Sequence, residues 1–388
     1  MNISAIRKPR LPDSMRELTP SLFALIMISI VMTVINHKFL LPSNISNLLL
    51  QQAEPAVLAL GLVMILFLGE IDLSVGAISG FCAAIMASLS VRHGVDPIIS
   101  MLIAIAVGAL VGLFQSFWSV TFKIPAFIIT LAGLIGWQGG LFAVIGGEGT
   151  IGLSDPKIEF LTSAFLSPAI SWSLGILTVV AFAVLRFETY RRCNKLELPS
   201  PTIFAVVVQV AIFTGVIVVL LVYLQRDRGV PFSFLIVLLI ASFLHLVSRY
   251  TRFGRQVFAI GGNAEAARRA GIPVKRVRIQ VFMIASTCAA IAGILGGSRL
   301  SAVGSGAGGG TLLLNAIAAV VIGGTSLFGG RGHIWSAVIG TLIIGAISNG
   351  MDLLALASPI KYAVTALVLL AAVTFDSVSR SRSAKMIS

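Results

Sequence analysis

The sequence predicts an all-α fold: a polytopic integral membrane helical bundle of about 10–12 transmembrane helices, with a short helix outside the membrane. Of the 388 residues, 57% are hydrophobic and 11% are charged, whereas soluble domains carry about 25% charged residues. A soluble fold of this composition would expose large apolar patches to water. The composition therefore excludes an ordinary soluble enzyme, and the abundance of apolar residues excludes intrinsic disorder.

Twelve apolar runs approach the length of about 20 residues that a helix needs to cross a bilayer. They begin near Ser21, Ala53, Ser74, Pro97, Pro125, Ala169, Thr202, Pro231, Ile279, Thr311, Ile334 and Pro359. The first run ends without a small-residue cleavage pattern, which predicts a retained span rather than a signal peptide. The runs at 53–69 and 311–328 are short and Gly-rich at their ends, which is typical of broken or re-entrant spans.

Basic residues are concentrated in alternate loops. With twelve spans and a cytoplasmic N-terminus, roughly three quarters of the 28 Lys and Arg residues lie on the cytoplasmic side, as the positive-inside rule requires. Both termini are then predicted to be cytoplasmic, and the net charge of +13 is an orientation signal rather than a sign of nucleic-acid binding. The three cysteines form no CxxC pair and the four histidines are scattered, so no metal site is predicted.

No long polar stretch divides the chain, so residues 1–388 are predicted to form a single transmembrane domain. A weak internal repeat is visible within it. Segments beginning at 47–50 and 311–314 each lead to a Gly-rich polar break, at 70–76 and 332–338 respectively. Repeats of this kind are common in transporters.

Residues 263–271 carry the signals of a complete two-turn helix. Asn263 is a good N-cap, and Glu265 lies in the first turn, where the helix dipole favours an anion. Arg268 and Arg269 lie in the last turn, where the dipole favours cations. Gly271 suits the left-handed position that ends a helix. Because so short a helix is unstable alone in water, it is either an ordinary loop helix or a docking element for a cytoplasmic partner.

The triplet Glu265-Ala266-Ala267 followed by Gly271 resembles the EAA…G pattern in the coupling loop of ABC-transporter permeases, although the later part of that motif is missing here. Further segments resemble the monosaccharide class of these permeases, the ribose and xylose type. These segments are 70–76, 124–133, 253–263 and 321–330. An extra segment at about 187–230 makes the chain similar to the xylose type, because ribose-type permeases are shorter.

The resemblance implies a homodimeric pore in a bacterial inner membrane that passes a neutral pentose, D-xylose, by alternating access. A separate ABC ATPase subunit would dock on the coupling loop, about 249–278, and a periplasmic sugar-binding protein would deliver the sugar. The implied ATPase-coupling residues are Asn263, Glu265, Ala266, Ala267, Arg268, Arg269 and Gly271. The chain contains no Gly-Lys dipeptide and hence no Walker A motif. We therefore expect no enzyme activity and no bound cofactor in this chain, with ATP and Mg²⁺ used by the partner.

Glu70 and Asp72 flank Ile71 at the end of an apolar run, followed by Ser74. Ionisable groups at membrane depth are functional candidates, so these three residues are candidates for a gate or pathway. The competing interpretation is an interfacial acidic pair in which Asp72 or Ser74 caps the next helix. A different class of function, an ion-coupled secondary sugar transporter, would use Glu70 or Asp72 as its coupling site.

Four other positions have two interpretations each. Gly323 and Gly324 suit either a broken span in the pathway or ordinary close helix packing. Arg226 and Arg228 lie on the outer side, and they indicate either a solvated turn or a contact with the binding protein. Glu54 is expected at the membrane interface. No convergent cluster of His, Asp or Cys supports a membrane-embedded enzyme.

Overall fold

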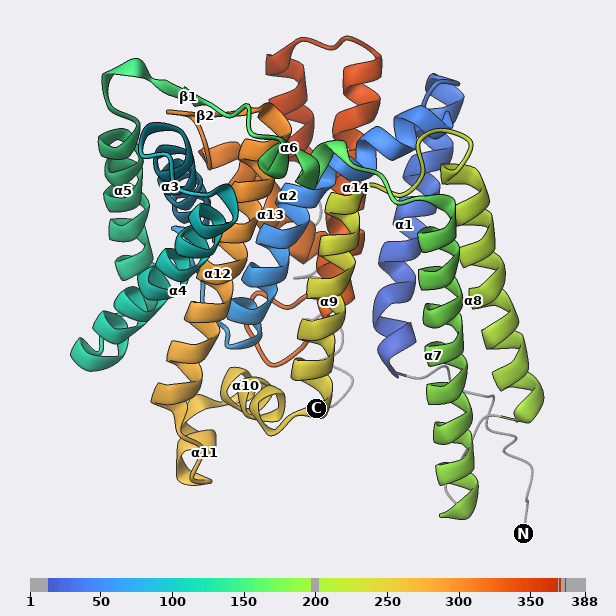
Figure 1. Ribbon diagram of the computed structural model, residues 1–388. Coiled ribbons are helices and arrows are strands. Elements are labelled where there is room, and N and C mark those ends of the chain that lie inside the picture. Colours follow the sequence, from blue (N-terminus) through green and yellow to red (C-terminus); the bar gives the residue numbers. More distant parts are fainter. Residues whose placement is uncertain (1–12, 197–201, 369, 371–373, 375–388) are drawn as a thin grey trace.

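The computed structural model describes residues 13–196, 202–368, 370 and 374, and these residues are mostly helical (Figure 1). Among them, 10 helices are long and apolar enough to cross a membrane, which confirms the predicted helical membrane bundle. They are α1 (Asp13–Ile35), α2 (Pro42–Phe67), α3 (Val75–Ala87) with its π-helical continuation η1 (Ser88–Arg92), α4 (Pro97–Phe122), α5 (Ala126–Ile145) with the 3-10 turn η2 (Gly146–Glu148), α7 (Pro168–Lys195), α8 (Ile203–Leu224), α9 (Phe232–Tyr250), α12 (Val274–Leu300) and α14 (Ile334–Leu353).

The shorter elements lie between these spans. They are β1 (Thr150–Gly152), α6 (Pro156–Ser163), α10 (Arg252–Gly262), α11 (Ala264–Arg269), β2 (Ala302–Gly304) and α13 (Gly310–Ile322). The 13-residue α13 is the short apolar helix expected within 311–328, and its crossing of the membrane stays a prediction. The short span predicted at 53–69 is wrong, because α2 is a continuous helix of 26 residues that includes Pro55. Polar residues in the middle of α2 interrupt its apolar pattern without interrupting the helix.

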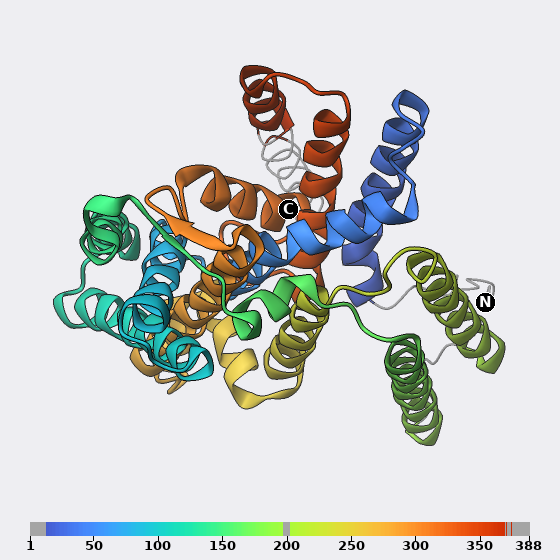
Figure 2. The same cartoon turned by 45° about the horizontal axis from the view of Figure 1, so that its top comes forward.

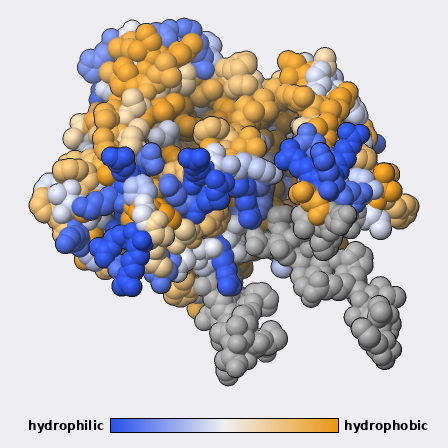
Figure 3. Space-filling model, turned by 90° about the horizontal axis from the view of Figure 1, so that it is seen from below, coloured by the Kyte–Doolittle hydropathy of each residue, from blue (hydrophilic) through white to orange (hydrophobic). Residues whose placement is uncertain are grey.

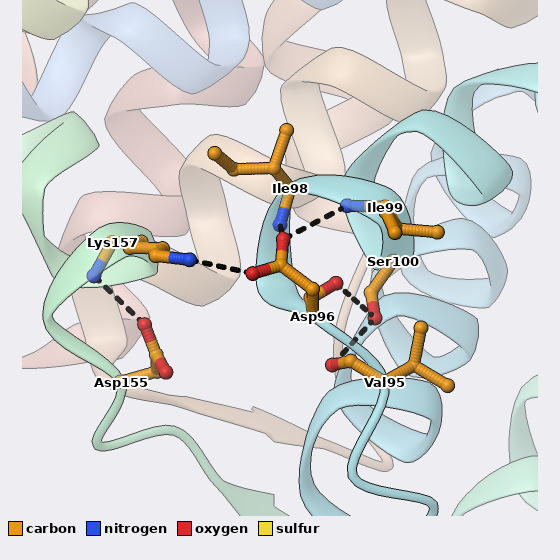
Figure 4. A network of polar contacts seen from close by, with 7 residues as sticks. All are labelled: Val95, Asp96, Ile98, Ile99, Ser100, Asp155 and Lys157. Carbon is orange, nitrogen blue, oxygen red and sulfur yellow. Dashed lines mark hydrogen bonds and ion pairs between the residues drawn. The ribbon is translucent and has the colours of Figure 1, made fainter.

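Side-chain caps fix the starts of several helices. Asp96 accepts hydrogen bonds from the backbone N–H groups of Ile98 and Ile99 at the start of α4 (Figure 4). Its other carboxylate oxygen accepts a hydrogen bond of 2.5 Å from Lys157 of α6. An acidic N-cap satisfies amides that have no partner inside the helix. Here the same carboxylate also ties α6 to α4.

Helix α12 lies at the centre of the core and packs on α2, α3 and α4 (Figure 1). Small residues allow these backbones to approach closely. A Cβ on Gly112 of α4 would lie 2.6 Å from the carbonyl oxygen of Phe282 in α12. A Cβ on Gly293 of α12 would lie 1.9 Å from the carbonyl oxygen of Ser79 in α3. Close packing through small residues is the usual way in which helices associate inside a bilayer.

The bundle has two distinct ends (Figure 1). β1 and β2 form an antiparallel pair beside α6 at one end, which we call the sheet end. Helices α10 and α11 lie at the opposite end, which we call the α11 end. The α7–α8 hairpin stands to one side of the body in both views (Figures 1 and 2). Its helices are joined by a hydrogen bond of 2.5 Å between Arg186 and Gln209.

Candidate functional site

A cavity of about 380 Å³ lies at the sheet end, between α2, α12, α13, α14 and the loop after β2. Its polar lining includes Gln51, Gln52, Glu54, Arg299, Thr311 and Asn315. Small-molecule sites are typically concave spaces of about 300–1,000 Å³ with a few convergent polar groups. The cavity therefore has the size and lining of a small-molecule site.

Glu54 and Arg299 both line this cavity and form an ion pair, with Glu54 Oε2 3.7 Å from a guanidinium nitrogen of Arg299. The Glu54 side chain is 14% exposed and that of Arg299 is 31% exposed. Glu54 was expected at the start of a span, whereas α2 begins at Pro42 and places it inside the helix, on the cavity wall. The signal in the sequence was the group of Gln51, Gln52 and Glu54 within one apolar run.

Two glycines on facing helices leave room for these polar side chains. A Cβ on Gly296 of α12 would lie 2.4 Å from Glu54 Oε1. A Cβ on Gly345 of α14 would lie 2.3 Å from the Cδ of Gln52. Any larger residue at either position would displace the polar side chain of α2. The packing thus accommodates polar groups that an apolar core would exclude.

Two breaks in the helical structure meet below the cavity. The first break, residues 68–74, joins α2 to α3, and the second break, residues 323–333, joins α13 to α14. The Gly330 N–H donates a hydrogen bond of 3.0 Å to the Phe67 carbonyl oxygen. A Cβ on Gly69 would lie 3.0 Å from the Phe328 carbonyl oxygen. The segments at the end of α2 and after α13 are therefore in direct contact.

Asp72 and Ser74 form a buried polar cluster in the first break. Asp72 Oδ1 accepts hydrogen bonds from the Ser74 backbone N–H at 2.7 Å and from its hydroxyl at 2.6 Å. The same hydroxyl lies 3.0 Å from Gln115 Oε1 of α4. Ser74 occupies the N-cap position of α3, but its side chain makes no capping bond. Asp72 is completely buried, and a buried carboxylate requires such hydrogen bonds. A role for Asp72 and Ser74 in a gate or pathway stays a prediction.

Glu70 forms an ion pair with Arg278, which lies near the start of α12. The Glu70 side chain is 10% exposed and that of Arg278 is 34% exposed. Breaking such a pair leaves an uncompensated charge, so the contact fixes the first break to α12. Sequence reasoning identified Glu70 but not its partner, which is more than 200 residues away in the chain.

Gly323 and Gly324 shape the second break. A Cβ on Gly323 would lie 2.0 Å from the Ser336 carbonyl oxygen, so this position needs glycine for contact between α13 and α14. Gly324 has φ +97°, a backbone conformation that favours glycine. Both the packing interpretation and the broken-span interpretation therefore apply to this pair. A role for it in a pathway stays a prediction.

The second break also contains a histidine that sequence reasoning did not single out. His333 is the N-cap of α14, and its Nδ1 accepts a hydrogen bond of 3.2 Å from the Trp335 backbone N–H. Its ring centroid lies 4.8 Å from that of His245 in α9. The described residues contain no group of His, Cys, Asp and Glu able to hold a metal ion.

Helix α11 has the form that the sequence predicts. The Asn263 side chain accepts a hydrogen bond of 2.9 Å from the Ala266 N–H, and Gly271 has φ +80°. Glu265 forms ion pairs with Arg268 at 2.9 Å and Arg269 at 3.2 Å. The hydrogen bond from Arg268 lowers the pKa of Glu265 below its ordinary value. Both arginine side chains are at least 70% exposed, which leaves this surface of α11 open.

Helix α10 connects α11 to the two breaks through Gly261. A Cβ on Gly261 would lie 1.8 Å from the Phe67 carbonyl oxygen and 2.6 Å from the Gly330 backbone nitrogen. Only glycine permits this approach. Gly261, which sequence reasoning did not single out, therefore packs directly against the end of α2, next to the first break, and against the second break.

Arg228 is held by contacts within the chain at the sheet end. It donates a hydrogen bond of 2.6 Å to Asn47 Oδ1 and pairs with Asp227 at 3.4 Å. Its guanidinium also lies 4.4 Å from the centroid of the Phe165 ring. Arg226 is exposed in the same turn. A contact of either arginine with a binding protein stays a prediction.

The membrane spans, the polar cavity at one end and the exposed helix at the other define an α-helical transport permease. The chain belongs to the family described as branched-chain amino acid transport system / permease component, whose model matches residues 44–373. The resemblance to sugar-transport permeases is confirmed by curated relatives, so the chain is a transport subunit rather than an enzyme.

One relative is the xylose transport system permease protein of Escherichia coli (strain K12), 37% identical over 346 residues that cover 89% of this chain and 87% of that protein. The xylose transport system permease protein of Haemophilus influenzae is 35% identical over 363 residues, 92% of this chain and 96% of that protein. The ribose import permease protein of Bacillus subtilis is 33% identical over 362 residues, 93% of each chain. No solved structure matches this chain.

Proposed function

We propose that this chain is the permease subunit of an ABC importer that passes a neutral pentose, D-xylose, through the inner membrane of a bacterium. The observation that carries the proposal is the similarity to xylose transport permeases over 89% of the chain. The cavity supports it, because its lining is polar and its Glu54–Arg299 pair has no net charge. An uncharged polar cargo fits such a lining.

The α11 end is the cytoplasmic side in this proposal. The two termini, which lie outside the described residues, are also proposed to be cytoplasmic. Residues 249–278, which include α10 and α11, contain eight Lys and Arg residues and one acid, as the positive-inside rule favours for a cytoplasmic loop. Figure 3 views the molecule from this side, where hydrophilic residues gather. The separate ATPase subunit docks on α10 and α11. The exposed surface of α11 and its contact with the breaks through α10 support this assignment.

The sheet end is the outer side, where the cavity receives the sugar from a periplasmic sugar-binding protein. Arg226 and Arg228 lie at this end and are the candidate contacts with that protein. The functional unit contains two copies of the chain. The chain itself binds no cofactor, and ATP and Mg²⁺ are used by the ATPase subunit.

Alternating access follows from the contacts at the breaks. Closure of the ATPase dimer moves α11, and α10 transmits the movement through Gly261 to the two breaks. The two breaks are candidates for segments that adopt two conformations, because they are short and held by polar contacts rather than by continuous helix, and the second break is also rich in glycine. The Glu70–Arg278 pair and the Asp72–Ser74 cluster stabilise the first break in one of the two states of alternating access.

The test is uptake of radiolabelled D-xylose into vesicles that contain the chain, the ATPase subunit of its transport system and the sugar-binding protein. The proposal predicts uptake that requires ATP and all three proteins and that survives collapse of the ion gradients by an ionophore. Uptake by the chain alone, driven by a proton or sodium gradient, would overturn the proposal in favour of an ion-coupled transporter with Glu70 or Asp72 as its coupling site.

A further inference from the structure

The cavity at the sheet end contains a charged pair, Glu54 and Arg299, that the packing of the bundle does not require. Glu54 lies on α2 between the fully packed residues Ala53 and Ala56, which are each 1% exposed. An ionised carboxylate in this position is costly unless it is paired and hydrogen-bonded. A long-chain apolar residue would fill the same space at no such cost. A polar residue at this position therefore needs an explanation other than stability.

The surroundings of Glu54 are open rather than sealed. Glu54 lines both the cavity of about 380 Å³ and a neighbouring cavity of about 250 Å³, and the loop residues 306–308 line both as well. Its partner Arg299 lies in the last turn of α12, close to the outer side. At 3.7 Å the pair is longer than a charge-assisted hydrogen bond of about 2.8 Å. Both groups therefore keep hydrogen-bonding capacity for a molecule in the cavity.

We propose that Glu54 and Arg299, together with Gln52 and Asn315, form a defined binding site for a neutral polyhydroxy compound in the outer half of the permease. The inference rests on the proposed function as a sugar permease and adds that the pathway contains a specific sugar site. Each hydroxyl of such a compound both donates and accepts. Glu54 accepts from hydroxyls, Arg299 donates to them, and the amides of Gln52 and Asn315 do both.

The charge balance selects the class of ligand. Glu54 and Arg299 carry opposite charges, so a neutral ligand leaves the site neutral, whereas a carboxylate or ammonium group would add an uncompensated charge in a partly buried place. Leu300 and Leu312 provide an apolar surface against which the C–H face of a sugar ring can pack. The glycines opposite Glu54 and Gln52 keep these two side chains beside the helices, so that the cavity between them stays open.

The experiment measures binding of radiolabelled D-xylose to the purified chain in lipid nanodiscs, without its partners, for the wild type, Glu54→Gln, Arg299→Gln and the double variant. Thermal unfolding of each variant is recorded in parallel. Glu188→Gln is the matched control, because it removes a carboxylate from an ion pair, with Arg192, that is exposed on α7. Uptake is then measured in vesicles with the ATPase and the binding protein.

A sugar site predicts at least about a tenfold weaker binding for each single variant, because a hydrogen bond to a charged group is lost. The double variant should bind as weakly or more weakly, with its stability restored, and the control should bind normally. A pair that only stabilises the fold would instead regain binding in the double variant together with stability. The inference would be overturned if the double variant regained D-xylose binding, or if Glu54→Gln bound D-xylose as tightly as the wild type.

The experiments distinguish a failure of the proposed sugar site from a failure of the proposed permease function. If the complete system transports D-xylose and Glu54→Gln has an unchanged KM, the sugar site is refuted and the permease function stands. If the complete wild-type system transports no sugar, the proposed function itself fails. D-xylonate, a charged analogue of the same sugar, should not compete for the wild-type site. Competition by D-xylonate that equals competition by unlabelled D-xylose would also overturn the inference.

Discussion

Replacing Gly261 by Ala tests the contact between α10 and the two breaks. The added methyl would lie 1.8 Å from the Phe67 carbonyl oxygen. Since an ordinary contact of this kind is about 3.5 Å, α10 must move away by roughly 1.7 Å. Overpacking of this size costs about 1–3 kcal/mol. Disturbance of the hydrogen bond from Gly330 to Phe67 adds about 1 kcal/mol.

The expected loss of stability is about 2–4 kcal/mol in total. The disturbance is at the contact between α10 and the membrane domain. We expect a lower temperature of thermal unfolding in detergent and at least a tenfold loss of ATP-driven uptake, with normal insertion into the membrane. The matched control is Gly262→Ala, the next residue of α10, where a Cβ would meet nothing within 4 Å. Alanine is favoured over glycine in a helix, so the control should retain full activity. Equal uptake by the two variants would refute the coupling route through Gly261.

Three further variants test other contacts. Gly271→Val places a β-branched residue at φ +80°, at a cost of at least about 1–2 kcal/mol; uptake should fall with membrane insertion intact, and uptake equal to wild type would contradict a lever role for α11. Glu70→Gln leaves Arg278 unpaired at a site that is about one third exposed, so stability should fall by about 1–3 kcal/mol, less than for a fully buried pair. Adding Arg278→Gln should restore the unfolding temperature, and further loss would contradict the pairing. The hydrogen bond from Lys157 lowers the pKa of Asp96; this contribution to stability is present above about pH 4 and is lost as the pH falls further. Asp96→Asn should therefore weaken the dependence of stability on pH in the acid range. An unchanged dependence would contradict this role of Asp96.

The sequence alone could predict the membrane bundle and α11, because both depend on local patterns. Apolar runs identify spans whatever their neighbours are, and a cap such as Asn263 acts within its own helix. The sites inside the bundle depend on contacts between distant segments. The residues next to Glu70 in the chain do not predict its ion pair with Arg278, and the residues next to Gly261 do not predict its contact with Phe67.

Glu54 shows the physical reason for one wrong prediction. A Glu beside a proline in an apolar run has the pattern of a span boundary, because charged groups usually avoid the membrane interior. Here α2 continues through Pro55, and glycines on α12 and α14 leave space for polar side chains. Only the packing of three helices reveals that space. The surroundings of Asp72 also depend on packing, because its carboxylate accepts hydrogen bonds from Ser74, whose hydroxyl lies beside Gln115 of α4.

We propose that this permease is driven by a separate ATPase that docks on α10 and α11. The most direct measurement is purification of the chain in mild detergent from its native membrane, followed by identification of the proteins that accompany it. We expect a P-loop ATPase to co-purify with the wild type and with the Glu188→Gln variant, and to be lost when Glu265 and Gly271 are both replaced. A chain that purifies alone and still drives sugar uptake under an ion gradient would contradict the account.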